Sequence, residues 1–269
     1  MMLNRQSDHT FRCAVWLRTI FSSIFIKAKN SRFGKNGGIR MRKEHVYSSD
    51  KLMKISSYLT AVTIFVMGLL DAFAVIKYDE LISAQTGNLV EMSTKLFTED
   101  WLDVYRNFLV FFAFALGVFL GKVVKEKLKG NRRKYQFYLL LQSAVLLVMA
   151  FVQGHMIRDV MVFFLAVLAG YNLALFRYFR KTEVNNGIMT GNLKDLMSKL
   201  YEVVFDPDEK SEQNFADLFA VIVIFVAGIF TGSFLVSVNQ RLVLWTAFFL
   251  IASPFLYLLF ENVTEGKRE

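Results

Sequence analysis

Polar residues that could take part in chemistry are few in this chain and are set within apolar sequence. Asp71 is the only formally charged residue inside the long apolar segments. A carboxylate in hydrocarbon costs about 2.5 kcal/mol or more unless it is paired or hydrated. We therefore expect Asp71 to belong to a binding site, or to be anchored near the outer end of its segment by Lys77 or Arg106. Asn172 occupies the matching place in a later segment, where its amide lines a solute path or hydrogen-bonds to a neighbouring helix.

A tripeptide that occurs twice is the second chemical feature. Residues 86–97 and 190–201 are identical at six of twelve positions. The tripeptide consists of Thr86, Gly87 and Asn88 in the first segment and of Thr190, Gly191 and Asn192 in the second. A carboxylate follows each asparagine by three residues, which is the spacing of a capping box and predicts a short helix capped by the asparagine. The free amide groups of its first turn would attract an anion or another small polar solute.

Two placements of these short helices agree with the sequence. In the first, each helix enters the membrane from one face, and the two meet at the midplane to form a polar constriction. In the second, each helix lies flat on its own membrane surface, with Glu91 paired to Lys95 and Asp195 paired to Lys199. The sequence leaves both placements, re-entrant and interfacial, open.

Six apolar segments must position these residues. The chain is 54% hydrophobic with a mean hydropathy of +0.37, which excludes a disordered chain and predicts an all-α polytopic membrane protein. Segments long enough to cross a bilayer are residues 55–76, 107–121, 135–157, 160–176, 218–240 and 242–260. Without the N-terminal tail, six spans place 15 basic residues inside and 5 outside, whereas eight spans reverse this bias to 5 and 12. We therefore predict six transmembrane helices with both termini cytoplasmic.

The spans divide into two similar halves, residues 55–157 and 158–260. Besides the repeated tripeptide, the second spans of both halves carry glycines four residues apart, which are Gly117 and Gly121, and Gly228 and Gly232. Such pairs predict close helix packing, within one chain or between copies in a homo-oligomer. Because each half has three spans, the second half must cross the membrane in the opposite sense. This inverted-repeat plan is met in transporters, whose sites lie near the symmetry axis.

The charges outside the spans exclude several functions. Residues 1–54 form a basic, partly flexible tail with 12 basic and 3 acidic residues, so the rest of the chain is neutral and a folded nucleic-acid reader is not expected. The true start is Met1, Met41 or Met53, and residues 261–269 form a C-terminal cytoplasmic tail. The single Cys13 allows no disulfide or metal cluster. No cofactor motif and no nucleophile with a base occurs in the sequence, so we do not expect an enzyme, a cofactor or a metal.

The paired sequence features resemble the YoaK family of bacterial membrane proteins, a domain of unknown function. The resemblance rests on Gly68-Leu69-Leu70-Asp71-Ala72, the first Thr-Gly-Asn, the later glycine and asparagine, and the second Thr-Gly, and it covers residues 55–260. It implies a bacterial inner-membrane protein of about six spans and no established activity. That family usually has Gly-x-Gln-Asn in the second half, whereas Ala169-Gly170-Tyr171-Asn172 retains only the asparagine.

Two functional hypotheses follow. The first is a small-solute transporter or channel, with both Thr-Gly-Asn segments, Asp71 and Asn172 along the path of a small polar or anionic solute. The alternative is a non-transporting membrane scaffold, or a stress-associated interaction protein, whose repeats serve only to pack. The lipid bilayer is a partner in both.

Overall fold

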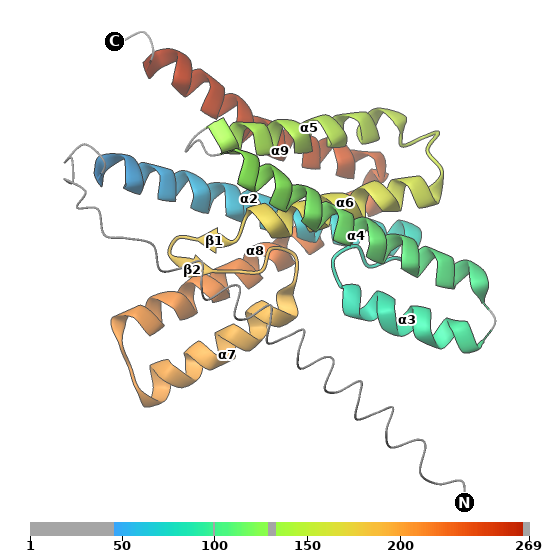
Figure 1. Ribbon diagram of the computed structural model, residues 1–269, viewed down its shortest axis with the longest axis horizontal. Helices are drawn as coiled ribbons and strands as arrows, with labels where there is room; N and C mark the ends of the chain where they lie inside the picture. The colour runs from blue at the N-terminus through green and yellow to red at the C-terminus, as the bar shows by residue number, and fades with distance from the viewer. Residues whose placement is uncertain (1–45, 99, 129–132, 266–269) are drawn as a thin grey trace, which may run out of the picture. The chain divides into compact units, whose positions relative to one another are not determined.

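A computed structural model describes residues 46–98, 100–128 and 133–265, with side chains for 53–98, 100–128 and 134–259. Most of the predicted basic tail and the alternative starts at Met1 and Met41 lie outside the described residues. The helices are α2 (Val46–Tyr78), α3 (Gln85–Phe97), α4 (Trp101–Lys127), α5 (Arg133–Val152), α6 (Arg158–Leu175), α7 (Met189–Phe205), α8 (Glu209–Asn239) and α9 (Arg241–Glu265). Within these described residues the fold is therefore all-helical apart from one small hairpin (Figure 1).

Six of these helices are long and apolar enough to cross a membrane, as predicted. The candidate spans are Met53–Tyr78, Trp101–Lys127, Lys134–Val152, Arg158–Leu175, Glu209–Asn239 and Arg241–Leu259. Several helices extend beyond the predicted apolar segments, because a helix continues through polar turns that hydropathy does not count. Helix α8 begins at Glu209 rather than near residue 218. Asp208 caps it, because its side chain accepts a hydrogen bond from Ser211 N. Helix α9 continues to Glu265, into the predicted C-terminal tail. These helices indicate a multi-pass membrane protein.

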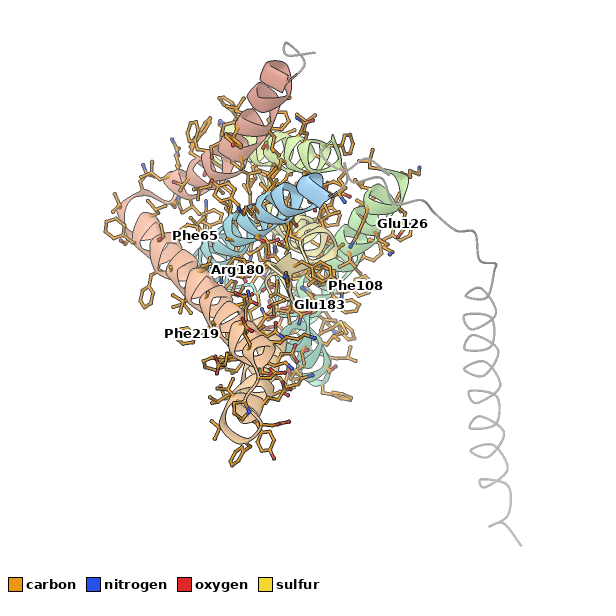
Figure 2. The ribbon with its side chains drawn as sticks, turned by 90° about the vertical axis from the view of Figure 1, so that its left-hand side faces the viewer. Phe65, Phe108, Glu126, Arg180, Glu183 and Phe219 are labelled. Carbon is orange, nitrogen blue, oxygen red and sulfur yellow. The ribbon has the colours of Figure 1, made fainter. Side chains whose placement is uncertain are left out.

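The hairpin between α6 and α7 was not predicted. Strands β1 (Tyr178–Phe179) and β2 (Thr182–Glu183) pair antiparallel around a two-residue turn. Arg180 adopts a left-handed φ of 53°, which two-residue hairpin turns require. Figure 2 shows Arg180 and Glu183 together on this hairpin. Because its strands are only two residues long, it has no alternation of apolar and polar residues that a sequence pattern could reveal.

Close backbone contact at glycines joins two pairs of long helices. A Cβ on Gly228 of α8 would lie 2.2 Å from Phe65 O of α2, and a Cβ on Gly68 of α2 would lie 2.2 Å from Phe225 O of α8. Helices α4 and α6 pack in the same way, since a Cβ on Gly117 would lie 2.1 Å from Val167 O. Helices α5 and α9 also pack against each other.

The two short helices accompany the beginnings of two long ones. Helix α3 packs on α4, and α7 packs on α8 (Figure 1). The predicted capping by Asn88 and Asn192 is wrong. Within the described residues, α3 has Ala84 at its N-cap, α7 has Ile188, and neither cap is formed by a side chain. Each helix begins three residues before its asparagine. The side-chain amide of the asparagine hydrogen-bonds to the preceding loop instead of capping the helix.

Aromatic side chains cover much of the outer surface. Phe108 of α4 is 54% exposed and stacks on Phe112, and Phe219 of α8 is 55% exposed and stacks on Phe215. Figure 2 labels Phe108 and Phe219, on two different helices of the fold. Exposed apolar side chains in such number are unfavourable in water and suit contact with lipid.

Candidate functional site

The two Thr-Gly-Asn segments anchor the loops that precede them. Asn88 is buried, and its Nδ2 donates to the carbonyl of Leu81 at 2.8 Å. Asn192 is fully buried, its Nδ2 donates to the carbonyl of Asn185 at 2.9 Å, and its Oδ1 accepts from Asn185 N at 2.7 Å. In both cases the partner lies seven residues upstream. The amide that was expected to cap the helix therefore satisfies the main chain of the loop.

The anchored loops touch each other. Gly187 has a left-handed φ of 84°, and a Cβ at this position would lie 3.5 Å from Cβ of Ser83 and 3.6 Å from Cε of Met67. Ser83 precedes Thr86 by three residues, and Gly187 precedes Thr190 by three. The two residues that stand three positions before the Thr-Gly-Asn tripeptides thus meet beside Met67 on α2.

Asp71 lies next to this contact. Its side chain is buried, with 8% of the residue exposed, and its Oδ2 accepts a hydrogen bond from Ser83 Oγ at 2.6 Å. Its Oδ1 has no hydrogen-bond partner in the described part of the chain. The proposed anchors have other contacts: Lys77 lies over the rings of Phe73 and Tyr78, and Arg106 pairs with acidic side chains. Asp71 is therefore held by the loop before α3 rather than by a basic side chain.

A cavity of about 340 Å³ adjoins Asp71. Its polar lining comes from Asp71, Ser83, Thr190 and Ser233, and its apolar lining includes Phe225. The wall thus combines α2, α8, the loops before α3 and α7, and the first residues of α7. Of the residues expected along a solute path, Asp71 and Thr190 line this cavity.

Buried amides continue the polar region along α2. Asn172 of α6 is fully buried, and its Nδ2 contacts Met67 Sδ at 3.4 Å. Asn186 Nδ2 donates to Thr63 Oγ1 at 2.8 Å. The side-chain oxygens of Asn172 and Asn186 have no partner among the described residues.

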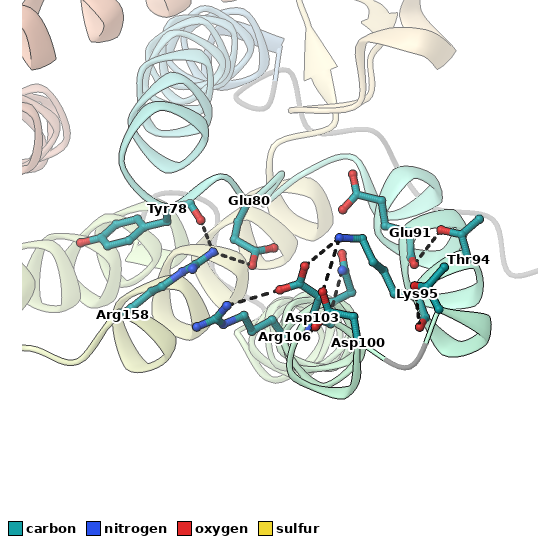
Figure 3. Close-up of polar contacts among 11 residues, drawn as sticks. Tyr78, Glu80, Glu91, Thr94, Lys95, Asp100, Asp103, Arg106 and Arg158 are labelled. Atoms are coloured by element: carbon teal, nitrogen blue, oxygen red, sulfur yellow. Dashed lines mark hydrogen bonds and ion pairs between the residues drawn. The ribbon is translucent and has the colours of Figure 1, made fainter.

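An ion-pair cluster lies where α2, α3, α4 and α6 approach one another (Figure 3). Arg158 donates to the Tyr78 carbonyl and lies 3.2 Å from Glu80 Oε1, while Lys95 lies 2.8 Å from Asp103. Burial raises the pKa of Glu80 to about 7, and the positive charge of Arg158 opposes that rise only in part. Hydrogen bonding to Asp103 raises the pKa of Lys95.

Arg106 belongs to the same cluster. It lies 3.3 Å from Asp103 and 3.7 Å from Asp159. The pairing of Lys95 with Asp103 differs from the helix-internal pair with Glu91 that the interfacial placement predicted. The cluster therefore joins different helices instead of stabilising one isolated helix.

A second polar cluster joins the hairpin to α8. Asp217 is fully buried, with Arg180 Nη1 at 2.8 Å and Thr182 Oγ1 at 2.9 Å from its carboxylate oxygens. On α7, Lys199 pairs with Glu202 at 2.7 Å rather than with Asp195. The Glu202 carboxylate also accepts from Ser211 Oγ, and these hydrogen bonds lower the pKa of Glu202.

The structure brings only part of the expected site together. Asp71 and Thr190 line one cavity, Asn172 lies nearby against Met67, and Asn88 and Asn192 hold the loops without lining the cavity. Sequence reasoning missed Ser83, Asn186 and Thr63. The spacing of Thr60, Thr63, Met67 and Asp71 on one face of a helix was the one available signal. The loop residues Ser83 and Asn186 gave no signal in the sequence, because their role depends on which helix they contact.

Metal binding gains no support from the side chains that are described. Among these residues, no group of three or more His, Cys, Asp or Glu side chains is arranged to hold a metal ion. The chemistry that the site offers is hydrogen bonding and charge pairing around a single carboxylate.

Comparison with known proteins adds a family to this geometry. The model of a family described as "Protein of unknown function (DUF1275)" matches residues 59–257. No curated protein and no solved structure matches the chain.

Proposed function

The chain belongs to the DUF1275 family of proteins of unknown function, in agreement with the resemblance found in the sequence, and we propose that it carries a small polar solute across a membrane. The observation that supports this most strongly is the contact between the two loops that precede α3 and α7. The proposal is of a transport role rather than a catalytic one.

The depth of the loop contact supports a solute path. Gly187 and Ser83 meet beside Met67, near the middle of the span Met53–Tyr78. Non-helical backbone at such a depth is tolerated only where it is buried in protein or lines a cavity. Here it borders the cavity that Asp71 also lines. We therefore favour the re-entrant placement of α3 and α7 over the interfacial one.

Matching contacts in the two halves support an inverted repeat. Gly228 meets Phe65 O and Gly232 meets Leu69 O, while Gly117 meets Val167 O and Gly121 meets Tyr171 O. In both halves the two carbonyls are four residues apart. Such an exchange of equivalent contacts is what a twofold axis between the halves produces. Transporters built on inverted repeats carry their sites near this axis and use broken helices to form them.

The distribution of basic residues supports an orientation. We place both termini in the cytoplasm of a bacterial cell and the six spans in its inner membrane, because the loops that this orientation puts inside contain most of the lysines and arginines. Helix α3 then enters from outside and α7 from the cytoplasm. No partner protein is required by this arrangement.

Osmotic swelling of proteoliposomes tests the proposal even though the solute is unidentified. Vesicles with purified protein are mixed with a panel of small polar solutes of positive, neutral and negative charge, and swelling is followed by stopped-flow light scattering. We expect faster entry of at least one solute than in protein-free vesicles, and slower entry after Asp71→Asn. Lys194→Gln, which removes an exposed charge on α7 away from the cavity, serves as the control.

Two results would oppose a transport role. One is permeability equal to that of protein-free vesicles for the whole panel. The other is entry that is unchanged when Asp71, Asn88 and Asn192 are replaced together. Either result would favour the alternative of a membrane scaffold whose buried polar residues serve only to pack.

A further inference from the structure

The cavity beside Asp71 has a single formal charge. Asp71 is its only ionisable lining residue, and no lysine, arginine or histidine lines it among the described side chains. The remaining polar groups are the hydroxyls of Ser83, Thr190 and Ser233. An anion in this cavity would meet an uncompensated carboxylate, whereas a cation would supply the missing opposite charge.

The hydrogen bonds of Asp71 are incomplete. Ser83 Oγ donates to Oδ2 and the main-chain N–H groups of Ile82 and Ser83 interact with the carboxyl group, while Oδ1 makes no hydrogen bond of ordinary geometry within the described ranges. A buried carboxylate is favourable only when it is both paired and hydrogen-bonded. A ligand that carries N–H donors on its positive centre satisfies both needs at once, whereas a quaternary ammonium would satisfy only the charge.

The rest of the lining is apolar and the volume is small. The apolar lining includes Ala72, Val75, Ile76, Leu81, Phe225 and Ile229. A volume of about 340 Å³ lies near the lower end of the range for ligand sites, roughly 300–1,000 Å³. This combination fits a cationic head with a short hydrocarbon body.

We infer that the cavity between α2, α8 and the two loops binds a primary ammonium group that carries a short apolar chain, with Asp71 as its counter-ion. This inference deepens the proposed function, since it names the class of solute. The head group donates to the Asp71 carboxylate and to the neighbouring hydroxyls, and the chain lies against Phe225 and Val75. The ammonium belongs either to a free amine or to the headgroup of an aminophospholipid.

Calorimetric titration of the purified full-length protein in detergent tests the inference. The probes are n-butylammonium, its neutral analogue n-butanol and its anionic analogue butyrate, in an amine-free buffer. We expect n-butylammonium to bind at least tenfold more tightly than either analogue. Asp71→Asn should weaken n-butylammonium binding at least tenfold, whereas Lys194→Gln should leave its affinity unchanged.

A second variant keeps the test informative if Asp71→Asn does not fold. Val75 lines the cavity and is 41% exposed, so Val75→Phe narrows the cavity without removing the charge or crowding the core. It should weaken the binding of n-butylammonium more than that of methylammonium.

Competition then identifies the source of the ammonium group. Displacement of n-butylammonium by short-chain phosphatidylethanolamine but not by phosphatidylcholine indicates a lipid headgroup, and no displacement by either indicates a free amine.

Three results would overturn the inference: no binding of n-butylammonium to folded wild-type protein, equal binding of n-butanol or butyrate, or unchanged affinity in Asp71→Asn. Failure of this inference can be told from failure of the transport proposal. Swelling with another solute but no ammonium binding removes only the inference. Asp71-dependent ammonium binding without any flux removes only the transport role.

Discussion

Two asparagines perform the same task at the scale of single residues, with unequal hydrogen bonding. Asn192 holds both the N–H and the carbonyl of Asn185, whereas Asn88 holds only the carbonyl of Leu81 and a side-chain contact to Gln85. Removing a side chain that leaves buried main-chain groups unpaired costs about 1–3 kcal/mol per group.

Alanine substitutions should reveal this inequality. We expect Asn192→Ala to lower the free energy of unfolding by about 2–6 kcal/mol and Asn88→Ala by about 1–3 kcal/mol, since they leave two and one main-chain groups unpaired. Unfolding of the purified variants in mixed micelles measures both values. Ser93→Ala, on an exposed part of α3, should change little. Equal losses in the two asparagine variants would contradict the assigned hydrogen bonds.

The buried carboxyl of Glu80 should make stability depend on pH. Its pKa in the folded protein is about 7, above the usual 4.5, so the folded state holds this proton more tightly than the unfolded state. Stability from this group is therefore present below about pH 4.5, declines as the pH rises to about 7, and is level above that.

Glu80→Gln isolates this dependence because glutamine resembles the neutral acid. The melting temperatures of variant and wild type should agree near pH 4.5, and the variant should be the more stable at pH 8. Thermal unfolding across this range checks the prediction. Parallel curves for the two proteins would show that the pKa of Glu80 does not change on folding.

Among the site residues, Asp71 could be predicted because one charge in an apolar segment needs no structural context to be noticed. Its partner Ser83 could not be predicted, because serine is common in loops. Its hydrogen bond to Asp71 depends on how the loop folds back over α2. The wrong prediction for Asn88 and Asn192 has a similar cause. Capping spacing is local, whereas the loop seven residues upstream competes for the same amide.

At the scale of elements, glycine determines how closely the long helices approach. Gly228→Ala and Gly117→Ala would each place a Cβ less than 2.5 Å from a carbonyl oxygen of the facing helix, at Phe65 and at Val167. The helices must separate, which we expect to cost about 1–3 kcal/mol in each variant. Gly154→Ala is a matched control, since its Cβ would be 3.7 Å from the end of the Arg241 side chain.

Chemical unfolding of the three glycine variants measures these losses. Similar losses in Gly228→Ala and Gly117→Ala, with little change in Gly154→Ala, are the expected result. A large loss in only one of the two helix pairs would argue against equivalent packing in the two halves.

The spans themselves could be predicted, because about 20 apolar residues suffice to identify a crossing helix. The extra turns of α4 and α8 could not, because polar residues there continue a helix without adding hydropathy.

For the whole molecule, the proposed transport role depends on two halves that meet through equivalent loops. The sequence repeat predicted the two halves, and the paired glycine contacts agree with a twofold relation between them. Contact between the loops could not be predicted, because it requires Ser83 and Gly187, 104 positions apart, to lie side by side next to Met67 of α2.

Disulfide formation between these two positions tests whether the loops meet. The separation of 3.5 Å between Cβ positions fits a disulfide, for which about 3.5–4.5 Å is usual. Ser83→Cys and Gly187→Cys are combined with Cys13→Ser in native membranes, oxidised, and analysed by mass spectrometry of the joined peptides. The single-cysteine variants are the controls, and an unaltered elution profile shows that the left-handed position tolerates cysteine. We predict a disulfide within one chain; thiols that stay free in the folded double variant would contradict the meeting of the loops.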